Sequence, residues 1–101
     1  MTKISKFDAA DYLKTPDAIA EYLNEAFESG DEAYISHALD TVARTKGITS
    51  VARETGLGRE SLYKTFKAGA KPEFDTVRKV IHSFGLRLVA EPIEKGKEAS
   101  G

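Results

Sequence analysis

Residues 48–67 read ITSVARETGLGRESLYKTFK, and this stretch decides the fold. Its pattern predicts two short helices joined by a tight turn. Thr49 is expected to cap the first helix, because a hydroxyl can accept a bond from a free amide at a helix start. Gly56 stands in the turn, where the backbone needs a positive φ. Leu62 and Phe66 lie four residues apart and give the second helix a buried side.

The second predicted helix keeps a polar and mostly basic side opposite its apolar residues. Such a pair is typical of a DNA-binding helix-turn-helix, whose second helix lies in the major groove. Short helix pairs joined by glycine also occur as ordinary packing units, so the surrounding charge has to support the interpretation. The exposed side of this helix is expected to consist of Arg59, Glu60, Tyr63, Lys64 and Lys67.

The charge is divided unevenly along the chain. From Arg44 to Lys71 there are seven basic and two acidic side chains, a local charge of +5, although the whole chain carries -1. Residues 1–43 hold three basic and nine acidic side chains, a charge of -6. A positive face attracts phosphates even on a slightly acidic protein. Charge runs are often only solvated surface, so the asymmetry supports nucleic-acid binding without establishing it.

Length and composition predict one folded domain. The chain has 101 residues, 41% of them hydrophobic, and no cysteine, which excludes disulfides, thiolate zinc sites and cysteine nucleophiles. It contains no apolar run of the roughly 18 residues that a membrane span needs, and its start lacks the apolar stretch of a secretory signal. We therefore expect a soluble cytoplasmic protein that does not bind membranes.

Residues for catalysis or for metal binding are not evident. His37 and His82 lie on different predicted helices and have no partner at ligand spacing. There is no glycine-rich phosphate loop, and no paired carboxylates can be recognised. The sequence predicts no enzyme, no small-molecule substrate, no metal and no cofactor.

Two longer helices are predicted before the central pair. Thr15 and Pro16 form a strong helix start, with a hydroxyl cap and proline at the first helical position, and this helix should stop at Gly30. Asp31 should cap the next helix, which runs to Gly47.

Two more helices flank this central part. Pro72 is expected to open a helix that ends at Gly85, with Phe74 turned inward, and Asp8 to cap a short helix near residues 9–13. The predicted fold class is all-α with about five helices. The predicted core comprises Ile19, Leu23, Phe27, Leu39, Val42, Ala52, Leu57, Leu62, Phe66, Val77, Ile81 and Phe84.

The spacing of apolar residues changes from a helical to a strand pattern after Gly85. In residues 86–91 apolar and other side chains alternate in a way that suits a short strand. A lone strand needs a partner from another chain, which favours a two-fold dimer with two antiparallel copies. Leu86, Leu88 and Ala90 would share one side of that ribbon. The alternatives are an unpaired segment laid over the core, or a dimer formed through the last helix. Residues 94–101 are polar and are expected to be a disordered tail.

Four segments of this chain together resemble the probable addiction-module antidote proteins, which are HigA-like antitoxins. The resemblance covers about residues 7–88 and implies a five-helix, lambda-repressor-like helix-turn-helix domain over residues 1–93, with residues 1–30 as a helical extension. It also implies a protein that neutralises a small RelE-like toxin and represses its own operon. Gly58 departs from the family, where serine is frequent, and this weakens the cap of the second helix. The segments are TPDAIAEYLNEAF (15–27), GDEAYISHAL (30–39), ARETGLGRESLYK (52–64) and FDTVRKVIHSFGLRL (74–88).

Arg59 is the best candidate for reading a base, because its planar guanidinium can donate to guanine O6 and N7 together. A phosphate contact, or a pair with a carboxylate of the same helix, is the alternative. Glu60 can accept from cytosine N4 or can hold a neighbouring arginine. Tyr63 can contact a thymine methyl group or a phosphate, or it can pack against the base of the helix.

Four further residues are expected to contact DNA phosphates. Lys64 and Lys67 carry the necessary charge. Thr49 and Ser50 lie at a predicted helix N-terminus, where backbone amides and hydroxyls commonly hold a phosphate.

The acidic first half is the expected docking surface for the toxin. RelE-like toxins are basic, so the resemblance implies a positively charged partner that an acidic surface would attract. The alternative is that these acids only solvate a helix. Two function classes stay open: a DNA-binding repressor, as antitoxin or as a stand-alone prophage-type regulator, and a toxin-binding module whose helix-turn-helix is only scaffold. The expected toxin-binding residues are Asp8, Asp11, Glu21, Glu25 and Glu28.

Overall fold

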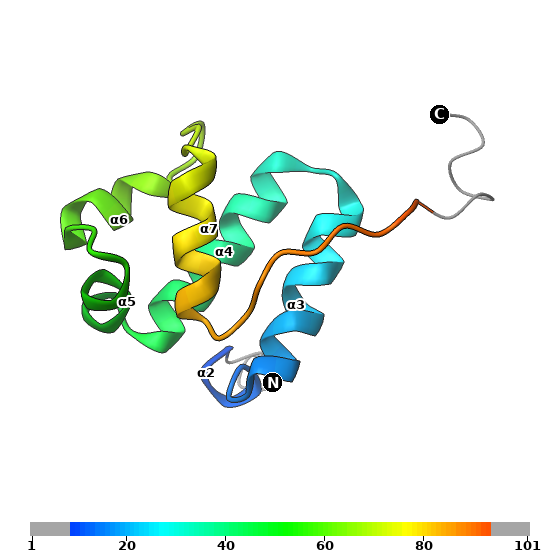
Figure 1. Ribbon diagram of the computed structural model, residues 1–101, viewed down its shortest axis with the longest axis horizontal. Coiled ribbons are helices and arrows are strands. Elements are labelled where there is room, and N and C mark those ends of the chain that lie inside the picture. Colours follow the sequence, from blue (N-terminus) through cyan, green and yellow to red (C-terminus); the bar gives the residue numbers. More distant parts are fainter. Residues whose placement is uncertain (1–8, 94–101) are drawn as a thin grey trace, which may run out of the picture.

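The computed structural model describes residues 9–93, and every regular element in that part of the chain is an α-helix (Figure 1). The all-helical class is confirmed, with five helices of seven or more residues after the short front helix. Asp8, the expected cap of that front helix, lies outside the described residues. The helices are α2 (Ala9–Tyr12), α3 (Pro16–Ser29), α4 (Glu32–Lys46), α5 (Ile48–Thr55), α6 (Arg59–Thr65) and α7 (Phe74–Ser83).

The first two long helices begin and end as their sequences predict. The hydroxyl of Thr15 accepts a hydrogen bond from the amide of Ala18 at 3.2 Å. The carboxylate of Asp31 accepts one from the amide of Ala33 at 3.0 Å. Gly30 ends α3 with a φ of 70°, a left-handed conformation that costs glycine little. These local signals fix α3 and α4 as an antiparallel pair joined by a very short turn.

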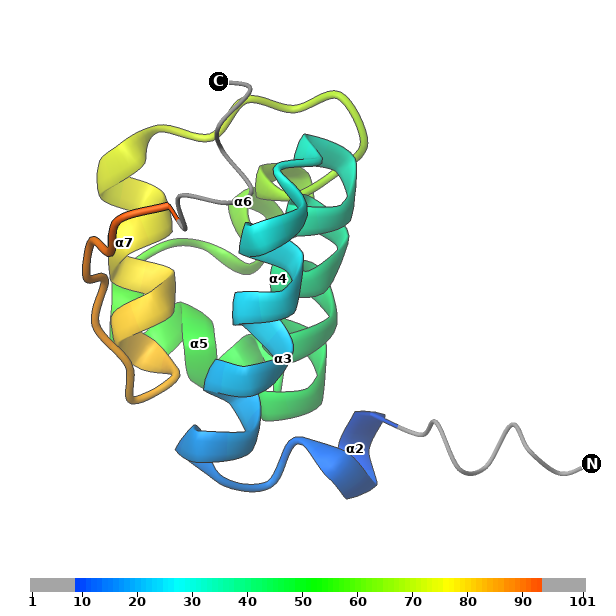
Figure 2. The same cartoon turned by 90° about the vertical axis from the view of Figure 1, so that its right-hand side faces the viewer.

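The helices pack in a chain of neighbours: α3 lies on α4, α4 on α5, and α5 on both α6 and α7. In Figure 1, α5 and α6 form one end of the molecule and α3 the other, with α4 and α7 between them. Figure 2 looks onto the α3 end and shows α2 below it. The acidic helix α3 and the basic helix α6 therefore lie at opposite ends.

The core lies where α4, α5 and α7 meet α3 and α6, and Phe84 is among its largest fully buried side chains. Eight of the predicted core residues are buried, and Ala52, Leu57 and Val77 are partly buried against them. The eight are Ile19, Leu23, Leu39, Val42, Leu62, Phe66, Ile81 and Phe84.

Two aromatic predictions were wrong. Phe27 was expected in the core but is 36% exposed, because the buried stripe of α3 passes through Leu23 and Ala26 and leaves Phe27 at its edge. Phe74 was expected to point inward but is 71% exposed, since it occupies the first turn of α7, before that helix reaches the core. Pro72 does not open α7 either, because the extended backbone of Glu73 delays the helix to Phe74.

The predicted strand over residues 86–91 is not found, since residues 86–93 have no regular secondary structure. Leu86 packs against the core, and its amide donates to the carbonyl of Ile81 at 3.3 Å. From Arg87 to Ile93 the side chains are exposed. A strand is held by ladder bonds to a second strand, and the described part of the chain contains none. No helix among residues 9–93 is long and apolar enough to cross a membrane.

Candidate nucleic-acid interface

The turn between α5 and α6 is held by one buried hydroxyl. Thr55 Oγ1 donates to the carbonyl of Val51 at 2.8 Å and accepts from the amide of Leu57 at 3.2 Å. Gly56, between them, has a φ of 80° and donates its amide to the carbonyl of Ala52 at 2.9 Å. The amides of Gly56 and Leu57 are thus both hydrogen-bonded in the turn that leads into α6.

We expect Thr55→Val to lower the free energy of unfolding by about 1–3 kcal/mol, because it keeps the volume but leaves the partly buried amide of Leu57 without its acceptor. Urea unfolding measures the change. Thr65→Val is the matched control: the Thr65 hydroxyl only donates to the carbonyl of Ser61, at 2.6 Å, so that variant should change stability by less than about 0.5 kcal/mol. Equal losses in the two variants would contradict the role given to Thr55.

The first helix of the pair begins earlier than predicted. Gly47, not Thr49, holds the cap position of α5, with no side-chain capping bond. Ile48 is buried in the core and is already the first residue of the helix. Thr49 and Ser50 therefore lie inside the first turn of α5, with Thr49 exposed and Ser50 partly so. Their place near the free amides of a helix N-terminus remains as expected.

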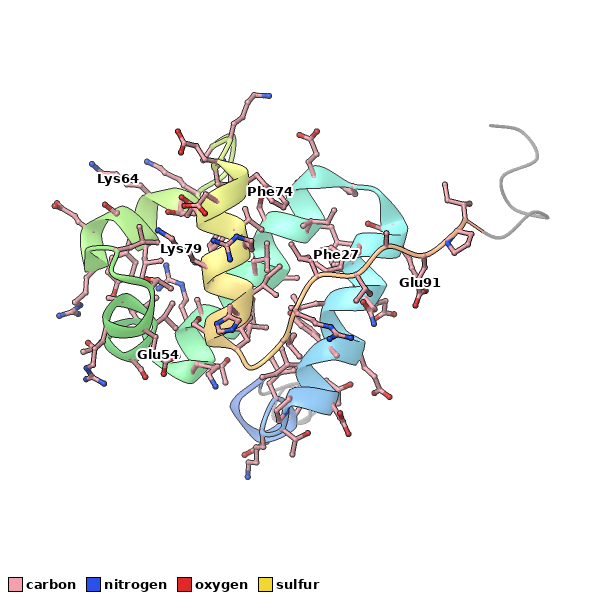
Figure 3. The ribbon with its side chains drawn as sticks, in the orientation of Figure 1. Phe27, Glu54, Lys64, Phe74, Lys79 and Glu91 are labelled. Carbon is pink, nitrogen blue, oxygen red and sulfur yellow. The ribbon has the colours of Figure 1, made fainter. Side chains whose placement is uncertain are left out.

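Helix α6 has one buried and one exposed side. Leu62 and Phe66 anchor it in the core. Figure 3 shows Lys64 projecting from α6 away from the rest of the chain. The exposed side carries every α6 residue predicted to touch DNA, together with the lysine that follows the helix: Arg59, Glu60, Tyr63, Lys64 and Lys67.

The basic residues on this side are not neutralised by neighbouring acids. In the described part of the chain, the ion pairs join Arg44 to Asp40, and Arg78 and Lys79 to Asp75. The alternative for Arg59, a pair with a carboxylate of its own helix, is therefore not observed. Hydrogen bonds from Arg78 and then Lys79 hold the pKa of the Asp75 carboxyl below its usual value. That cluster lies on α7, outside the α6 face.

Tyr63 contacts a side chain of another helix. It is 41% exposed, and its ring lies under the guanidinium of Arg44, whose Cζ is 5.1 Å from the ring centroid. Arg44 Nε donates to Asp40 Oδ2 at 2.8 Å, and this bond, together with the charge of Asp40, raises the pKa of Arg44. Sequence reasoning counted Arg44 only as part of the basic run. The four-residue spacing of Asp40 and Arg44 could have predicted their ion pair on a helix. Nothing in the sequence could have predicted the contact between Arg44 and Tyr63.

A groove of about 570 Å³ lies between α4 and the loop that follows α6. Glu32, His37 and Asp40 line one wall, and Lys67 and Lys71 line the other. Lys67 thus lies at the rim where α6 ends. Among residues 9–93 no three His, Asp or Glu side chains come together as they would to hold a metal ion.

The predicted toxin-binding acids that the structure describes lie at the other end of the molecule, and Asp8 lies outside the described residues. Glu21, Glu25 and Glu28 are exposed on α3, and their spacing places them on one side of that helix. Asp11 is exposed on α2. The Tyr12 hydroxyl donates to Glu21 Oε1 at 3.5 Å, which ties α2 to this acidic side.

Two helices joined at a left-handed glycine, the second with an exposed basic side, form a helix-turn-helix arrangement. The family model of the probable addiction module antidote protein matches residues 3–92, and the chain belongs to this family. A protein of Haemophilus influenzae strain Rd, described as uncharacterized, is 34% identical over 86 residues, which is 85% of this chain and 89% of that protein. No solved structure matches the chain. The family gives the chain an antidote role in an addiction module and a toxin as its partner.

Proposed function

We propose that this antidote also represses transcription, binding operator DNA of its own module through α5 and α6. The observation that carries the proposal is the exposed side of α6, where Arg59, Lys64 and Lys67 have no ion-pair partner in the described chain. Free cations on one helix face release condensed counterions when they meet phosphates, which is the main source of affinity for DNA. DNA and toxin would both be met in the cytoplasm.

The residues take different roles along the interface. Arg59 lies in the first turn of α6, with Glu60 beside it and Tyr63 one turn later. In this proposal Arg59 enters the major groove and reads guanine. Lys64 and Lys67 contact phosphates farther along the helix. Phosphate contacts from the start of α5 fix the register of the domain on the duplex, and these involve Thr49 and Ser50.

The test is equilibrium binding to two labelled duplexes, the DNA upstream of the module and a scrambled sequence of equal length. We expect tighter binding to the first, and a steep loss of affinity for both as salt rises. Binding that is weak and equal for the two duplexes would leave toxin capture as the sole function, with the helix pair as scaffold.

The toxin partner is proposed to be a basic, RelE-like protein that docks on the acidic side of α3. Exposed acids at helical spacing give a negative surface, and charge complementarity mainly speeds association. Tyr12 and Tyr22 meet edge to face, with ring centroids 6.5 Å apart, at the start of this surface. Aromatic side chains with exposed polar atoms are frequent in protein interfaces.

We further propose a two-fold dimer formed through residues 86–91. No backbone hydrogen bond within the described chain uses the amides of residues 87–91, and Leu88 and Val89 are 41% and 65% exposed. Free amides and carbonyls beside apolar side chains are a template for pairing with a second copy. Pairing of two copies would give the strand that the single chain lacks, with Leu86, Leu88 and Ala90 on one side.

Leu88→Pro is expected to produce monomers that bind the operator much more weakly, because proline removes a ladder donor and one recognition helix covers too few base pairs. Sedimentation velocity measures the assembly, and circular dichroism checks that the helices remain. The control is Leu88→Ala, which keeps the amide and should stay largely dimeric. If the proline variant sediments as a dimer, the interface lies elsewhere, and α7 with its exposed Phe74 is the alternative.

A further inference from the structure

Asp40, Arg44 and Tyr63 form a contact chain from the middle of the domain to the exposed side of α6. Asp40 and Arg44 lie one turn apart on α4, and the carboxylate fixes the guanidinium through Nε at 2.8 Å. The guanidinium then covers the ring of Tyr63, with 5.1 Å between Cζ and the ring centroid. The distance is within the range in which a cation is attracted to an aromatic face.

Tyr63 is 41% exposed, and no hydrogen bond in the described part of the chain fixes its ring. Its hydroxyl makes no hydrogen bond within the described residues, and the neighbours one turn away on the exposed side of α6 are Arg59 and Lys67, both polar. A partly exposed side chain can exchange between rotamers. The contact with Arg44 favours one ring orientation before DNA arrives.

We propose that Arg44 is a positioning residue for sequence reading, which holds the ring of Tyr63 in the orientation that α6 presents to a base edge. The inference rests on the proposed repressor function. Ordering a ring in advance removes an entropic cost from binding, and the benefit is realised only where the ring meets its proper base. Arg44 thereby raises affinity for the operator more than affinity for other DNA.

The remaining donors of Arg44 stay available. A guanidinium has five N–H donors, and in the described chain only Nε is used, by Asp40. The side chain is 54% exposed, so its terminal nitrogens can also reach a phosphate. A phosphate contact would raise affinity for all sequences alike, which is how the two roles can be separated.

The experiment is a double-mutant cycle on the full chain, with Arg44→Lys and Tyr63→Leu alone and together. Arg44→Lys keeps the charge but loses the flat, anchored group, and Tyr63→Leu removes the ring. The readout is the ratio of affinities for two duplexes: one selected from a random pool by the wild-type protein, and its scrambled form. We expect each single variant to lower this ratio about two- to five-fold, and the double variant to lower it no further than Tyr63→Leu does.

Tyr63→Phe is the matched control, since it keeps the ring, and in that background Arg44→Lys should still lower the ratio. A second readout needs no DNA: the side-chain protons of Arg44 should carry a ring-current shift in the NMR spectrum that Tyr63→Leu abolishes and Tyr63→Phe retains. Asp40→Asn should reduce this shift, because it weakens the anchor of the guanidinium.

The outcomes separate this inference from the function on which it rests. Selection that enriches no duplex overturns the proposed repressor function and this inference with it. A selective wild-type protein whose two variants act additively overturns the inference alone and leaves Arg44 as a phosphate contact. Loss of affinity for both duplexes by the same factor in Arg44→Lys also overturns it.

Discussion

Replacing Arg59 by alanine is expected to weaken operator binding by about 1–3 kcal/mol and to relax sequence choice, the largest effect of any single change on the α6 face. The side chain lies in the first turn of α6, exposed and without an ion pair in the described chain, so nothing there competes for its donors. Alanine favours the helix, and so the domain should remain folded. Titration of specific and scrambled duplexes at several salt concentrations measures both affinity and selectivity.

Lys67→Ala is the matched comparison, because it removes a cation at the other end of the same face. It should lower affinity for all sequences alike and flatten the salt dependence by about one unit, as the loss of a single phosphate contact does. If Arg59→Ala behaves in the same way as Lys67→Ala, Arg59 contacts a phosphate and the base assignment is wrong.

The second large effect is expected in toxin capture. Changing Glu21, Glu25 and Glu28 to lysine reverses the acidic side of α3, and should slow association with a basic toxin by about tenfold or more at low salt. The three side chains are exposed, so the fold should change little. Stopped-flow association across a range of ionic strengths measures the rate, and the difference from wild type should shrink as salt rises.

A second triple variant controls for total charge. Lysines at Glu54, Glu73 and Glu91, all exposed and outside α3, change the formal charge of the chain from -1 by the same amount. This variant should associate with the toxin at a rate much closer to wild type. Equal slowing of both triples would show that the toxin responds to net charge, and would place its docking surface elsewhere.

The parts of the fold that follow from near neighbours in sequence could be predicted. Thr15 and Asp31 act as caps, and Gly30 and Gly56 end their helices, because each needs only the few residues beside it. Thr49 shows the limit. Its hydroxyl suited a cap, but burial of Ile48 moved the start of α5, and that burial depends on the whole core.

Positions that depend on a neighbouring helix were harder to predict. The buried stripe of α3 is narrower than its apolar residues suggest, which left Phe27 partly exposed. The exposed residues of α6 could be predicted from the sequence, because helical spacing places them on one side of a short helix. Arg44 was missed as a member of that face, since it comes from α4 and reaches Tyr63 only through the packing of separate helices. The strand predicted over residues 86–91 is not found, because alternation of side chains alone does not supply the second strand that a ladder needs, and the described chain contains none.

The distance between α3 and α6 has a consequence for how such modules diversify. With α4 and α7 between them, α3 and α6 lie at opposite ends of the molecule (Figure 1). On the two proposed assignments, a lineage could exchange its toxin through changes on α3 while keeping its operator, or acquire a new operator through changes on α6 while keeping its toxin. Each change would be tested by selection one surface at a time. Related modules in one genome could thereby escape cross-talk in two short, independent steps.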